Sequence, residues 1–408
     1  MTFTCPECNT KTQTEVPVNA VNFACPNCSR LFGFNKVGES RELKKYKHES
    51  DNIVLKTGQK AKLFGKEYEV TGAIVKKVPP KYFWREYILV SKDGEKRYLS
   101  ETNGHWIFLE ESPDLYDVSY YPRTLTHNNI QTKLYDYASC SIVQCEGFFD
   151  FEIPSREIKM VEYINPPYVV SIEITGKDEV TYFGKHISAS DVKKAFKIEH
   201  MPEKTGVGIV QPYLFDVRNM AIILSCFALL ILIGHLIIYS GREETTVLSK
   251  NMNFSEFNNK DYVSDSFVLN GASAPLTIAL SSDVNNSWAA LQVALINEST
   301  NEEIYASKDI EYYHGYEGGE SWSEGSQNEK FYICGVPQGK YHLTLTPSKP
   351  FESKQNSYIN VNVKWNQPSL WNVFLPIGIM AGIVILFYFL NLFFEQQRWS
   401  ESNFSPYE

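Results

Sequence analysis

Four cysteines close to the N-terminus have the residue type and the spacing of a metal site. Cys5 and Cys8 form one C-x-x-C pair, and Cys25 and Cys28 form another; a phenylalanine precedes each pair by two residues, so one local motif is used twice. Each pair closes a tight turn that aims two thiolates at one point, and two such pairs complete the tetrahedron of sulfur ligands that Zn²⁺ prefers. Because protein would fill all four ligand positions, we expect a structural zinc ribbon and not a catalytic metal.

Three other uses of the four cysteines stay open: disulfide bonds, a redox-active C-x-x-C, and an iron site. Neither pair is surrounded by the strand–helix pattern that accompanies thioredoxin-like redox pairs. Thiolate zinc sites persist in reducing compartments. The pattern therefore favours zinc and predicts a cytosolic N-terminus.

A second group of residues with binding chemistry lies in the acidic, aromatic segment 311–330 (EYYHGYEGGESWSEGSQNEK). Its carboxylates Glu317, Glu320 and Glu324 attract cations, and the face of Trp322 adds cation–π attraction. This composition suits a polyamine, another organic cation or Ca²⁺. The alternative is a solvated hairpin loop in which a few aromatic side chains pack, because loops are commonly polar.

Signatures of catalysis are missing from the sequence. It contains no G-x-x-x-x-G-K-[ST], G-x-S-x-G or H-E-x-x-H motif, and His105 and His186 are isolated from any nucleophile or carboxylate motif. We therefore expect a protein that is not an enzyme. The alternative is an undetected enzyme or an accessory subunit, which a cleft holding both histidines and carboxylates such as Glu101 and Glu173 would favour.

The segment 57–200, which contains these histidines, has the pattern of a β-rich domain. Asp93-Gly94 and Asn103-Gly104 are hairpin signals between aromatic and β-branched runs. A short helix is expected over 190–198, with Ser190 as its N-cap. Closely spaced hairpins with glycine corners predict a small barrel or sandwich. Strands are expected over four runs: 61–70, 82–90, 105–109 and 169–175.

Several runs in this segment resemble a known family. GQKAKLFGKEYEVTG, WREYIL and TNGHWIFL resemble the opening half of a bacterial membrane-associated domain family of unknown function, and VEYINPPYVVSIEIT and EVTYFGKHISASDVKKAF are similar to its closing half. The resemblance covers roughly residues 58–197 and rests on glycines, aromatic residues and hairpin signals. It implies a bacterial origin and a membrane location. It also implies relatives that carry an N-terminal zinc ribbon and are often encoded near polyamine aminopropyltransferases, but it supplies no active site.

Two long uncharged apolar runs, 219–240 and 371–394, are long enough to cross a bilayer as helices. The first begins after more than half of the chain, so it is not a signal peptide. From a cytosolic N-terminus, two crossings return the C-terminus to the cytosol and leave 241–369 outside. Gly378 and Gly382 form a G-x-x-x-G on which the first span or a second copy of the chain would pack closely, so a homo-oligomer stays open.

The net charge of −9 is concentrated in the segment expected outside the cell. Residues 241–369 carry 9 basic and 16 acidic residues, whereas residues 1–218 carry 29 of each. A neutral cytosolic part disfavours broad contact with phosphate backbones, so nucleic-acid binding through the ribbon is kept only as an alternative. Cys334, the one cysteine of the outer segment, is expected to be a buried strand residue, and Cys140 and Cys145 are expected to be buried thiols.

We therefore expect a mainly β, multidomain protein of the bacterial cytoplasmic membrane that serves as a sensor, adaptor or scaffold. A protein partner is expected in the cytosol. The expected parts are a zinc ribbon (1–36), a linker (37–56), a cytosolic β-rich domain (57–200), two transmembrane helices (219–240 and 371–394), an extracytoplasmic β-sandwich (250–367) and a cytosolic tail (395–408).

Overall fold

The chain is mainly β and forms two compact units in the computed structural model, which describes residues 1–35, 38–47, 53–240, 244–353 and 355–407. The first unit comprises residues 1–220 and 384–408, and the second comprises residues 221–383. Five parts of the predicted organisation lie partly outside the described residues: the end of the ribbon (36), the linker (37 and 48–52), the residues that follow the first span (241–243), the sandwich (354) and the tail (408).

The N-terminal residues form two short hairpins. One pairs β1 (Thr2–Thr4) with β2 (Lys11–Gln13), and the other pairs β3 (Asn22–Ala24) with β4 (Arg30–Phe34). β5 (Ser40–Lys45) falls in the predicted linker and pairs with β4. This part of the linker therefore extends the sheet of the ribbon.

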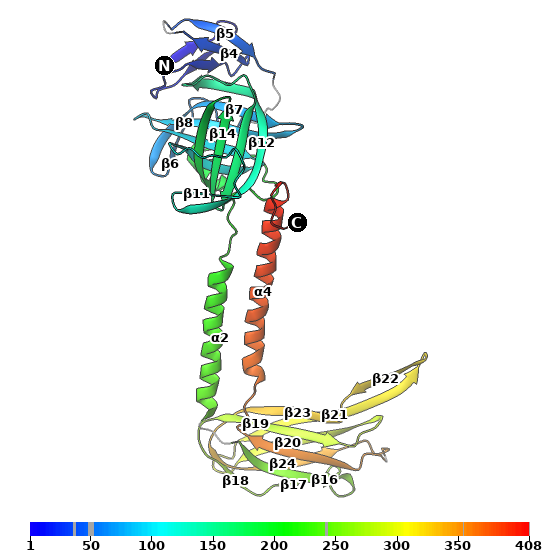
Figure 1. Cartoon of the computed structure of the whole chain (residues 1–408). Helices are drawn as coiled ribbons and strands as arrows, with labels where there is room; N and C mark the ends of the chain where they lie inside the picture. The colour runs from blue at the N-terminus through cyan, green and yellow to red at the C-terminus, as the bar shows by residue number, and fades with distance from the viewer. Residues whose placement is uncertain (36–37, 48–52, 241–243, 354, 408) are drawn as a thin grey trace. The chain divides into compact units, whose positions relative to one another are not determined.

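Eight antiparallel strands of the predicted β-rich domain close into a barrel (Figure 1). The sequence left a barrel and a sandwich open, and the structure settles on the barrel. Three further elements belong to this domain but not to the ring: β6 (Lys60–Leu63), β11 (Thr124–His127) and α1 (Ala189–Phe196). In order around the ring, the strands are β7 (Lys66–Val78), β8 (Tyr82–Ser91), β9 (Lys96–Thr102), β10 (His105–Ser112), β15 (Asp178–Ile187), β14 (Tyr168–Thr175), β13 (Ile158–Asn165) and β12 (Ile130–Phe149).

The 20-residue strand β12 joins the barrel to the ribbon. It pairs first with β13, then with β7, and its last three residues pair with β3. Gly147 on β12 lies opposite Gly72 on β7, and a Cβ at Gly147 would lie 2.2 Å from the carbonyl oxygen of Thr71. The barrel therefore closes where two glycines allow the backbones to approach, and one continuous sheet connects it to the ribbon.

Two-residue turns connect β9 with β10, β13 with β14 and β14 with β15. Asn103 and Gly104 have φ angles of 49° and 76°, which are typical of a type I′ turn, and the hairpin predicted there is confirmed. The run 61–70, predicted as one strand, is a hairpin instead. Phe64 and Gly65 have φ angles of 49° and 86° and reverse the chain between β6 and β7.

The short helix predicted over 190–198 is α1, but its N-cap was predicted wrongly. The hydroxyl of Ser188 accepts a hydrogen bond of 3.1 Å from the N–H of Asp191. Ser190, the predicted N-cap, lies inside the first turn. Ser188 still has extended backbone angles, with φ −70° and ψ 142°, and this is the conformation an N-cap requires.

The second unit contains a β-sandwich of two antiparallel sheets around one core (Figure 1). Buried residues of both sheets, such as Ile278 and Val293, belong to that core. A short helix, α3 (Phe254–Phe257), follows the first strand. The first sheet has the order β16 (Thr245–Asn253), β25 (Tyr358–Trp365), β19 (Ala274–Ser282), β23 (Asn328–Val336). The second has the order β17 (Tyr262–Val263), β24 (Gly339–Ser348), β20 (Ser287–Asn297), β21 (Glu303–Glu317), β22 (Glu320–Gly325), with β18 (Phe267–Leu269) also paired to β24.

Cysteine burial was predicted correctly in the barrel and wrongly in the sandwich. Cys140 and Cys145 are buried on β12, as expected. Cys334 is exposed on β23, because successive residues of a strand face opposite sides and the neighbouring Ile333 takes the core side.

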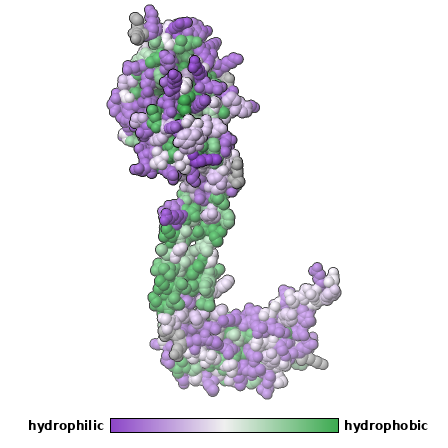
Figure 2. Space-filling view, in the orientation of Figure 1, coloured by the Kyte–Doolittle hydropathy of each residue, from purple (hydrophilic) through white to green (hydrophobic). Residues whose placement is uncertain are grey.

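Two helices are long and apolar enough to cross a membrane. They are α2 (Val217–Ser240) and α4 (Trp371–Trp399), whose most apolar 18-residue windows have mean hydropathies of 2.8 and 2.6. In these windows 0% and 6% of the residues are buried, and Figure 2 shows their hydrophobic side chains on the surface. A core helix of a soluble protein buries most of its side chains, and these two helices do not.

Candidate metal centre and barrel cavity

The two C-x-x-C pairs lie on turns with the same backbone hydrogen bonds. In the first turn the N–H of Cys5 donates to the carbonyl of Thr10, and the N–H of Asn9 donates to the carbonyl of Cys5. Cys25 and Ser29 make the equivalent bonds in the second turn. Asn9 and Ser29 both have left-handed φ angles, 58° and 56°. The sequence motif that is used twice therefore folds in the same way twice.

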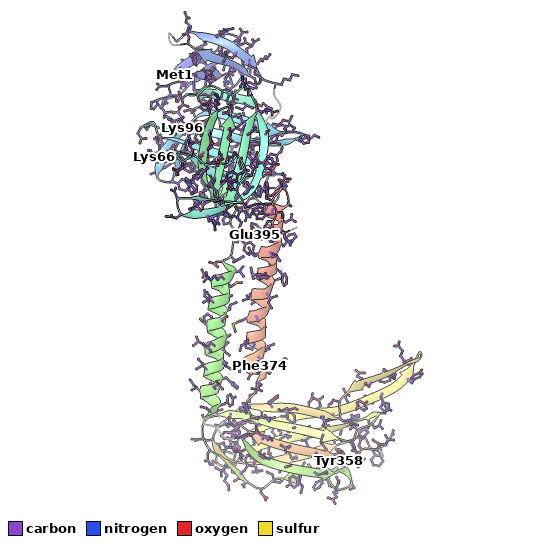
Figure 3. The ribbon with its side chains drawn as sticks, in the orientation of Figure 1. Met1, Lys66, Lys96, Tyr358, Phe374 and Glu395 are labelled. Carbon is purple, nitrogen blue, oxygen red and sulfur yellow. The ribbon has the colours of Figure 1, made fainter. Side chains whose placement is uncertain are left out.

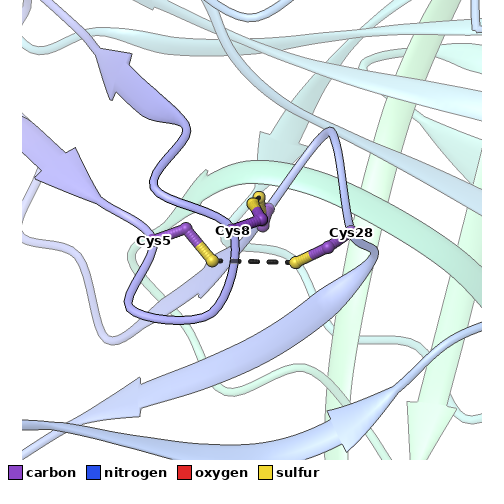
Figure 4. A group of neighbouring side chains, drawn as sticks. Cys5, Cys8 and Cys28 are labelled. Atoms are coloured by element: carbon purple, nitrogen blue, oxygen red, sulfur yellow. Dashed lines mark hydrogen bonds between the residues drawn. The ribbon is translucent and has the colours of Figure 1, made fainter.

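The four sulfur atoms are arranged for one metal ion. The Sγ atoms of Cys5 and Cys28 are 3.6 Å apart (Figure 4), those of Cys8 and Cys25 are 3.5 Å apart, and all four lie within 4.8 Å of one another. A tetrahedron with Zn–S bonds of about 2.3 Å has S–S edges of about 3.8 Å. All four cysteines are free, and the distances are far too long for disulfide bonds. Number, type and spacing of the donors fit Zn²⁺.

An aromatic cluster surrounds the cysteines and connects them to the barrel. Cys5 and Cys25 are fully buried together with Phe23 and Phe148. Phe148 belongs to β12, so the sulfur cluster packs directly against a barrel strand. Burial raises the pKa of the Cys25 thiol to about 12. The thiol therefore stays protonated when no cation is bound, and a bound Zn²⁺ would displace that proton.

The barrel encloses a cavity that the sequence analysis did not identify. About 70 Å³ is open to the centres of water molecules, and one water molecule needs roughly 10–15 Å³. Side chains from β8, β9, β10, β13, β14 and β15 line it, together with Gly208–Gln211, here called the cover segment. Eight-stranded barrels are wide enough to hold either packed side chains or one small ligand. This barrel leaves room for a ligand.

A buried lysine and two half-buried glutamates lie beside the cavity. Nζ of Lys76, on β7, is 2.6 Å from Oε1 of Glu173 and 2.8 Å from Oε2 of Glu86. Trp84 donates its indole N–H to the other oxygen of Glu86 over 2.7 Å. Burial opposes the charge of Lys76, but Glu173 and Glu86 outweigh it and raise the pKa of Lys76 above its ordinary value. One ammonium group is thus shared by two carboxylates.

A third carboxyl group, Glu162 on β13, has no such partner. Within the described residues it makes no hydrogen bond or ion pair, and it borders the cavity. Burial first, and then Asp136, Glu173 and Glu86, raise the pKa of Glu162 to about 7. Glu162 lies opposite Ser171 on β14, which is 6% exposed and whose hydroxyl also lacks a partner among the described residues. A carboxyl and a hydroxyl therefore face one cavity without hydrogen-bond partners.

A cleft that holds His105, His186, Glu101 and Glu173 would favour an enzyme, and the barrel forms part of such a cleft. His105, His186 and Glu173 border the cavity together. Glu101 does not border it and instead accepts a hydrogen bond of 2.9 Å from the N–H of Gly104. The barrel thus brings together three of the four side chains that sequence reasoning considered for this role.

The surroundings of both histidines favour the neutral ring. Burial lowers the pKa of His105, and it lowers the pKa of His186 to about 4. Nε2 of His105 lies 3.0 Å from the carbonyl oxygen of Thr205 and therefore donates its proton there. A Cβ at Gly208, in the cover segment, would lie 2.7 Å from the His105 ring, so glycine lets the segment pack onto this ring.

Arg398, near the end of α4, holds the cover segment in place. Its Nη1 donates to the carbonyls of Gly208 (2.8 Å) and Ile209 (3.0 Å), and its Nη2 donates to the carbonyl of Gln211 (2.6 Å). Glu395, labelled on α4 in Figure 3, accepts hydrogen bonds of 3.0 Å from both Nε and Nη2. The Arg398 side chain is fully buried. One wall of the cavity is therefore bonded to an apolar helix.

The residues around Arg398 also dock on the barrel. The ring of Trp399 packs on that of Tyr135, with centroids 5.2 Å apart, and the hydroxyl of Tyr135 donates to the carbonyl of Arg398 over 2.9 Å. The amide of Asn403 donates to Asp136 over 2.9 Å. The C-terminal residues are thus an integral part of the first unit.

The candidate cation loop of the sandwich is a projecting hairpin of β21 and β22. Glu317 lies opposite Glu320, and Trp322 lies opposite Gly315. Because alternate residues and cross-strand partners share a side, Glu317, Glu320, Trp322 and Glu324 occupy one face of the hairpin. All four are exposed. Within the described residues, three or more metal-binding side chains come together only at the four cysteines.

Sequence reasoning missed the charged residues that matter most to the cavity. Glu86 recurs in phase with Trp84 and Ile88 along β8, and this alternation is a signal for an inward-facing charge. Glu162 and Arg398 give no comparable signal, because their surroundings depend on which strands become neighbours.

Three similar solved structures are weak likenesses. PNGF-II has 9% identity and a TM-score of 0.19, with 73% of this chain and 67% of that chain covered. The insecticidal delta-endotoxin Cry8Ea1 from Bacillus thuringiensis has 7% identity and a TM-score of 0.17, with 78% and 54% covered. A structure of infectious bursal disease virus, Gt strain, has 7% identity and a TM-score of 0.19, with 85% and 67% covered. At such low TM-scores, these likenesses carry no argument about the fold.

Comparison by sequence points to the barrel domain alone. No curated protein matches the chain significantly. Residues 56–189, which contain β6 to β15, match a family model described as a domain of unknown function (DUF4178). The matched range overlaps residues 58–197, for which the sequence indicated a resemblance to an uncharacterised domain family. Most of the residues that line the cavity lie in this domain.

Proposed function

We propose that this chain is a two-span membrane protein that senses a small molecule in its cytosolic barrel and relays the state of that barrel through α4. The observation that carries the proposal is the contact between Arg398 and the cover segment. The four residues of this segment line the cavity, and three of them accept hydrogen bonds from the end of an apolar helix. A ligand that shifts the cover segment would therefore act on the helix.

The proposed orientation places the ribbon, the barrel and the C-terminal residues in the cytosol. The barrel and the C-terminal residues around Arg398 pack within one unit, so they must share one side of any membrane that α2 and α4 cross. A four-thiolate zinc site favours the reducing side. The sandwich, with its excess of acidic residues, is then extracytoplasmic.

Cys334 provides a direct test of orientation, because it is exposed on the sandwich. Intact cells that produce the full chain are treated with a membrane-impermeant maleimide, and labelled peptides are mapped by mass spectrometry. We expect label at Cys334 before permeabilisation and at the N-terminal cysteines only afterwards, if at all. Cys334→Ser is the matched control. Label on the N-terminal cysteines of intact cells would reverse the proposed orientation.

The expected cytosolic protein partner and the homo-oligomer are further parts of the proposal. The G-x-x-x-G face of α4 supports an oligomer, since a Cβ at Gly378 or Gly382 would meet no atom within 4 Å in the described structure. Crosslinking of the protein in its native membrane, followed by mass spectrometry, separates the two cases. A species twice the mass of the chain supports the oligomer, and a stoichiometric second protein supports the partner.

A second candidate function is catalysis in the barrel, favoured by the shared cavity of His105, His186 and Glu173. We rank it second because His105 is buried and held by a backbone carbonyl, and because half-burial lowers the pKa of His186 to about 4. Turnover of a bound molecule, as opposed to its recovery unchanged, would reverse this ranking.

A further inference from the structure

The interior of the barrel carries more negative than positive charge. Glu86, Glu162 and Glu173 border the cavity, and Lys76 is paired with two of them. Charges held away from water are costly unless they are paired, so Glu162, the half-buried carboxyl group left over, is a site for a positive charge. A cationic ligand would complete the pairing, whereas an anionic ligand would add to the imbalance.

The walls of the cavity suit an organic cation. Aromatic side chains recur around the lining: Tyr82, Trp84, Tyr98, Trp106 and Tyr182. The faces of such rings attract ammonium groups, more strongly where water is excluded. Apolar side chains such as Ile107 and Leu109 add surface for an alkyl group.

Two adjacent polar groups are available to bind N–H donors. Glu162 and Ser171 lie directly opposite each other on β13 and β14, and neither has a hydrogen-bond partner among the described residues. Opposite residues on antiparallel strands have their Cβ atoms about 4.5–5.5 Å apart, so one ammonium group would reach both. Ser171 is 6% exposed, so its unpaired hydroxyl is a second sign of a missing ligand.

A metal ion fits this cavity less well. Nζ of Lys76 already occupies the position between Glu86 and Glu173. In the described part of the chain, the close group of metal-binding side chains is the four cysteines and does not include these glutamates.

We propose that the barrel cavity is a binding site for a small organic ammonium ion, whose N–H groups contact Glu162 and Ser171 and whose alkyl part packs among the aromatic side chains. This inference rests on the proposed sensor function and names the class of molecule that would be sensed. The limited space favours an ion of a few carbon atoms.

Calorimetric titration of the detergent-solubilised full chain tests the site. The probe is propylammonium chloride, and the matched controls are propan-1-ol and sodium propionate, which keep the alkyl group but carry no charge or the opposite charge. We expect heat of binding from the amine and none from the alcohol or the anion. Equal binding of the alcohol, or no binding of the amine up to tens of millimolar, would overturn the proposal.

Variants locate the site within the protein. Glu162→Gln should weaken amine binding by about tenfold or more, since it removes the charge and keeps the shape, and Ser171→Ala should weaken it severalfold. Glu157→Gln, at an exposed position, is the control and should bind as the unaltered chain does. Because two single variants are tested, one that fails to fold leaves the other informative. Unchanged affinity in a folded variant of either residue would contradict the assigned contacts.

Hydrogen exchange separates this inference from the sensor function. Amine binding that changes exchange in the cover segment and near Arg398 supports both. Amine binding without that change keeps the site and removes the relay through α4. The binding measurement does not depend on membrane orientation, so a failed orientation test leaves it unaffected.

Discussion

At the scale of single residues, Arg398 concentrates several contacts in one buried side chain. Its guanidinium donates to three backbone carbonyls and to Glu395. Guanidinium groups suit this role because their donors are fixed in one plane and remain charged. The loss of this one side chain would leave several buried acceptors unpaired.

Arg398→Gln should therefore destabilise the barrel unit by about 3 kcal/mol, as expected when one partner of a buried, hydrogen-bonded charge is removed. Hydrogen exchange should rise first in the cover segment, because its carbonyls lose their donors. Arg156→Gln is the control, since Arg156 is exposed. Equal effects of the two substitutions would show that the contacts of Arg398 carry no special weight.

Glu162 should make stability depend on pH. The pKa of Glu162 is raised from 4.5 to about 7 in the folded chain, so the folded state holds this proton more tightly than the unfolded state. Its contribution to stability is complete below about pH 4.5 and is lost as the pH rises through 7. The groups that face it are Asp136, Glu86 and Glu173, opposed by Lys76.

Glu162→Gln should remove this dependence. Between pH 4.5 and 8, the unaltered chain should lose roughly 3 kcal/mol of stability relative to the variant, as expected for a shift of this size. Urea unfolding of both proteins at several pH values measures the difference. Glu157→Gln should leave the pH profile as it is, and parallel profiles for the unaltered chain and Glu162→Gln would contradict the prediction.

The sequence predicted the four cysteines because the ligands of a ribbon come in short local pairs. It did not predict the cavity, because Lys76 and Glu86 lie on one hairpin, whereas Glu162 lies on β13, far along the chain from both. Only the register of the closed barrel brings them together. Local spacing thus identifies a site when the ligands are neighbours in sequence, and it fails when topology assembles them.

At the scale of elements, β12 determines whether the barrel closes and whether the ribbon stays attached. The hairpins around it follow from local turn signals such as Asn103-Gly104, which the sequence contains in readable form. The closing pair of β12 with β7 joins residues about 70 positions apart, and no local pattern specifies it. The choice between barrel and sandwich therefore needed the structure.

Gly147→Ala should open this closure. An alanine there must adopt a left-handed φ of 97° and place its Cβ 2.2 Å from a backbone oxygen. The conformation costs about 1–2 kcal/mol and the overlap about 1–3 kcal/mol more. Gly176→Ala measures the cost of the backbone conformation alone, because Gly176 also has a positive φ but has open space around it. Denaturant unfolding should rank Gly147→Ala clearly below Gly176→Ala, and an equal loss would mean that β12 and β7 separate at little cost.

At the scale of the whole molecule, the chain divides into two units that each have a core. The first contains the ribbon, the barrel and the C-terminal residues, and the second contains the sandwich. Composition predicted both β-rich parts, but it did not show that the C-terminal residues belong to the first unit. That assignment depends on contacts such as Tyr135 with Trp399, more than 260 residues apart.

Removal of metal should destabilise one unit and spare the other. Structural zinc contributes about 10–16 kcal/mol to the folding of small zinc modules, and here the cysteines share a buried cluster with Phe148 of β12. A strong chelator, or Cys25→Ser, should therefore increase hydrogen exchange in β3 and at the end of β12, where the two strands pair. The sandwich strands β20 and β24 should exchange as before, because they belong to a separate unit, and this comparison is an internal control in the same sample.

Cys334→Ser, a cysteine substitution far from the cluster in sequence, should change neither unit's response to the chelator. If exchange rises equally in both units, they are coupled more tightly than their separate cores indicate; if it rises in neither, the four thiolates do not hold a structural metal.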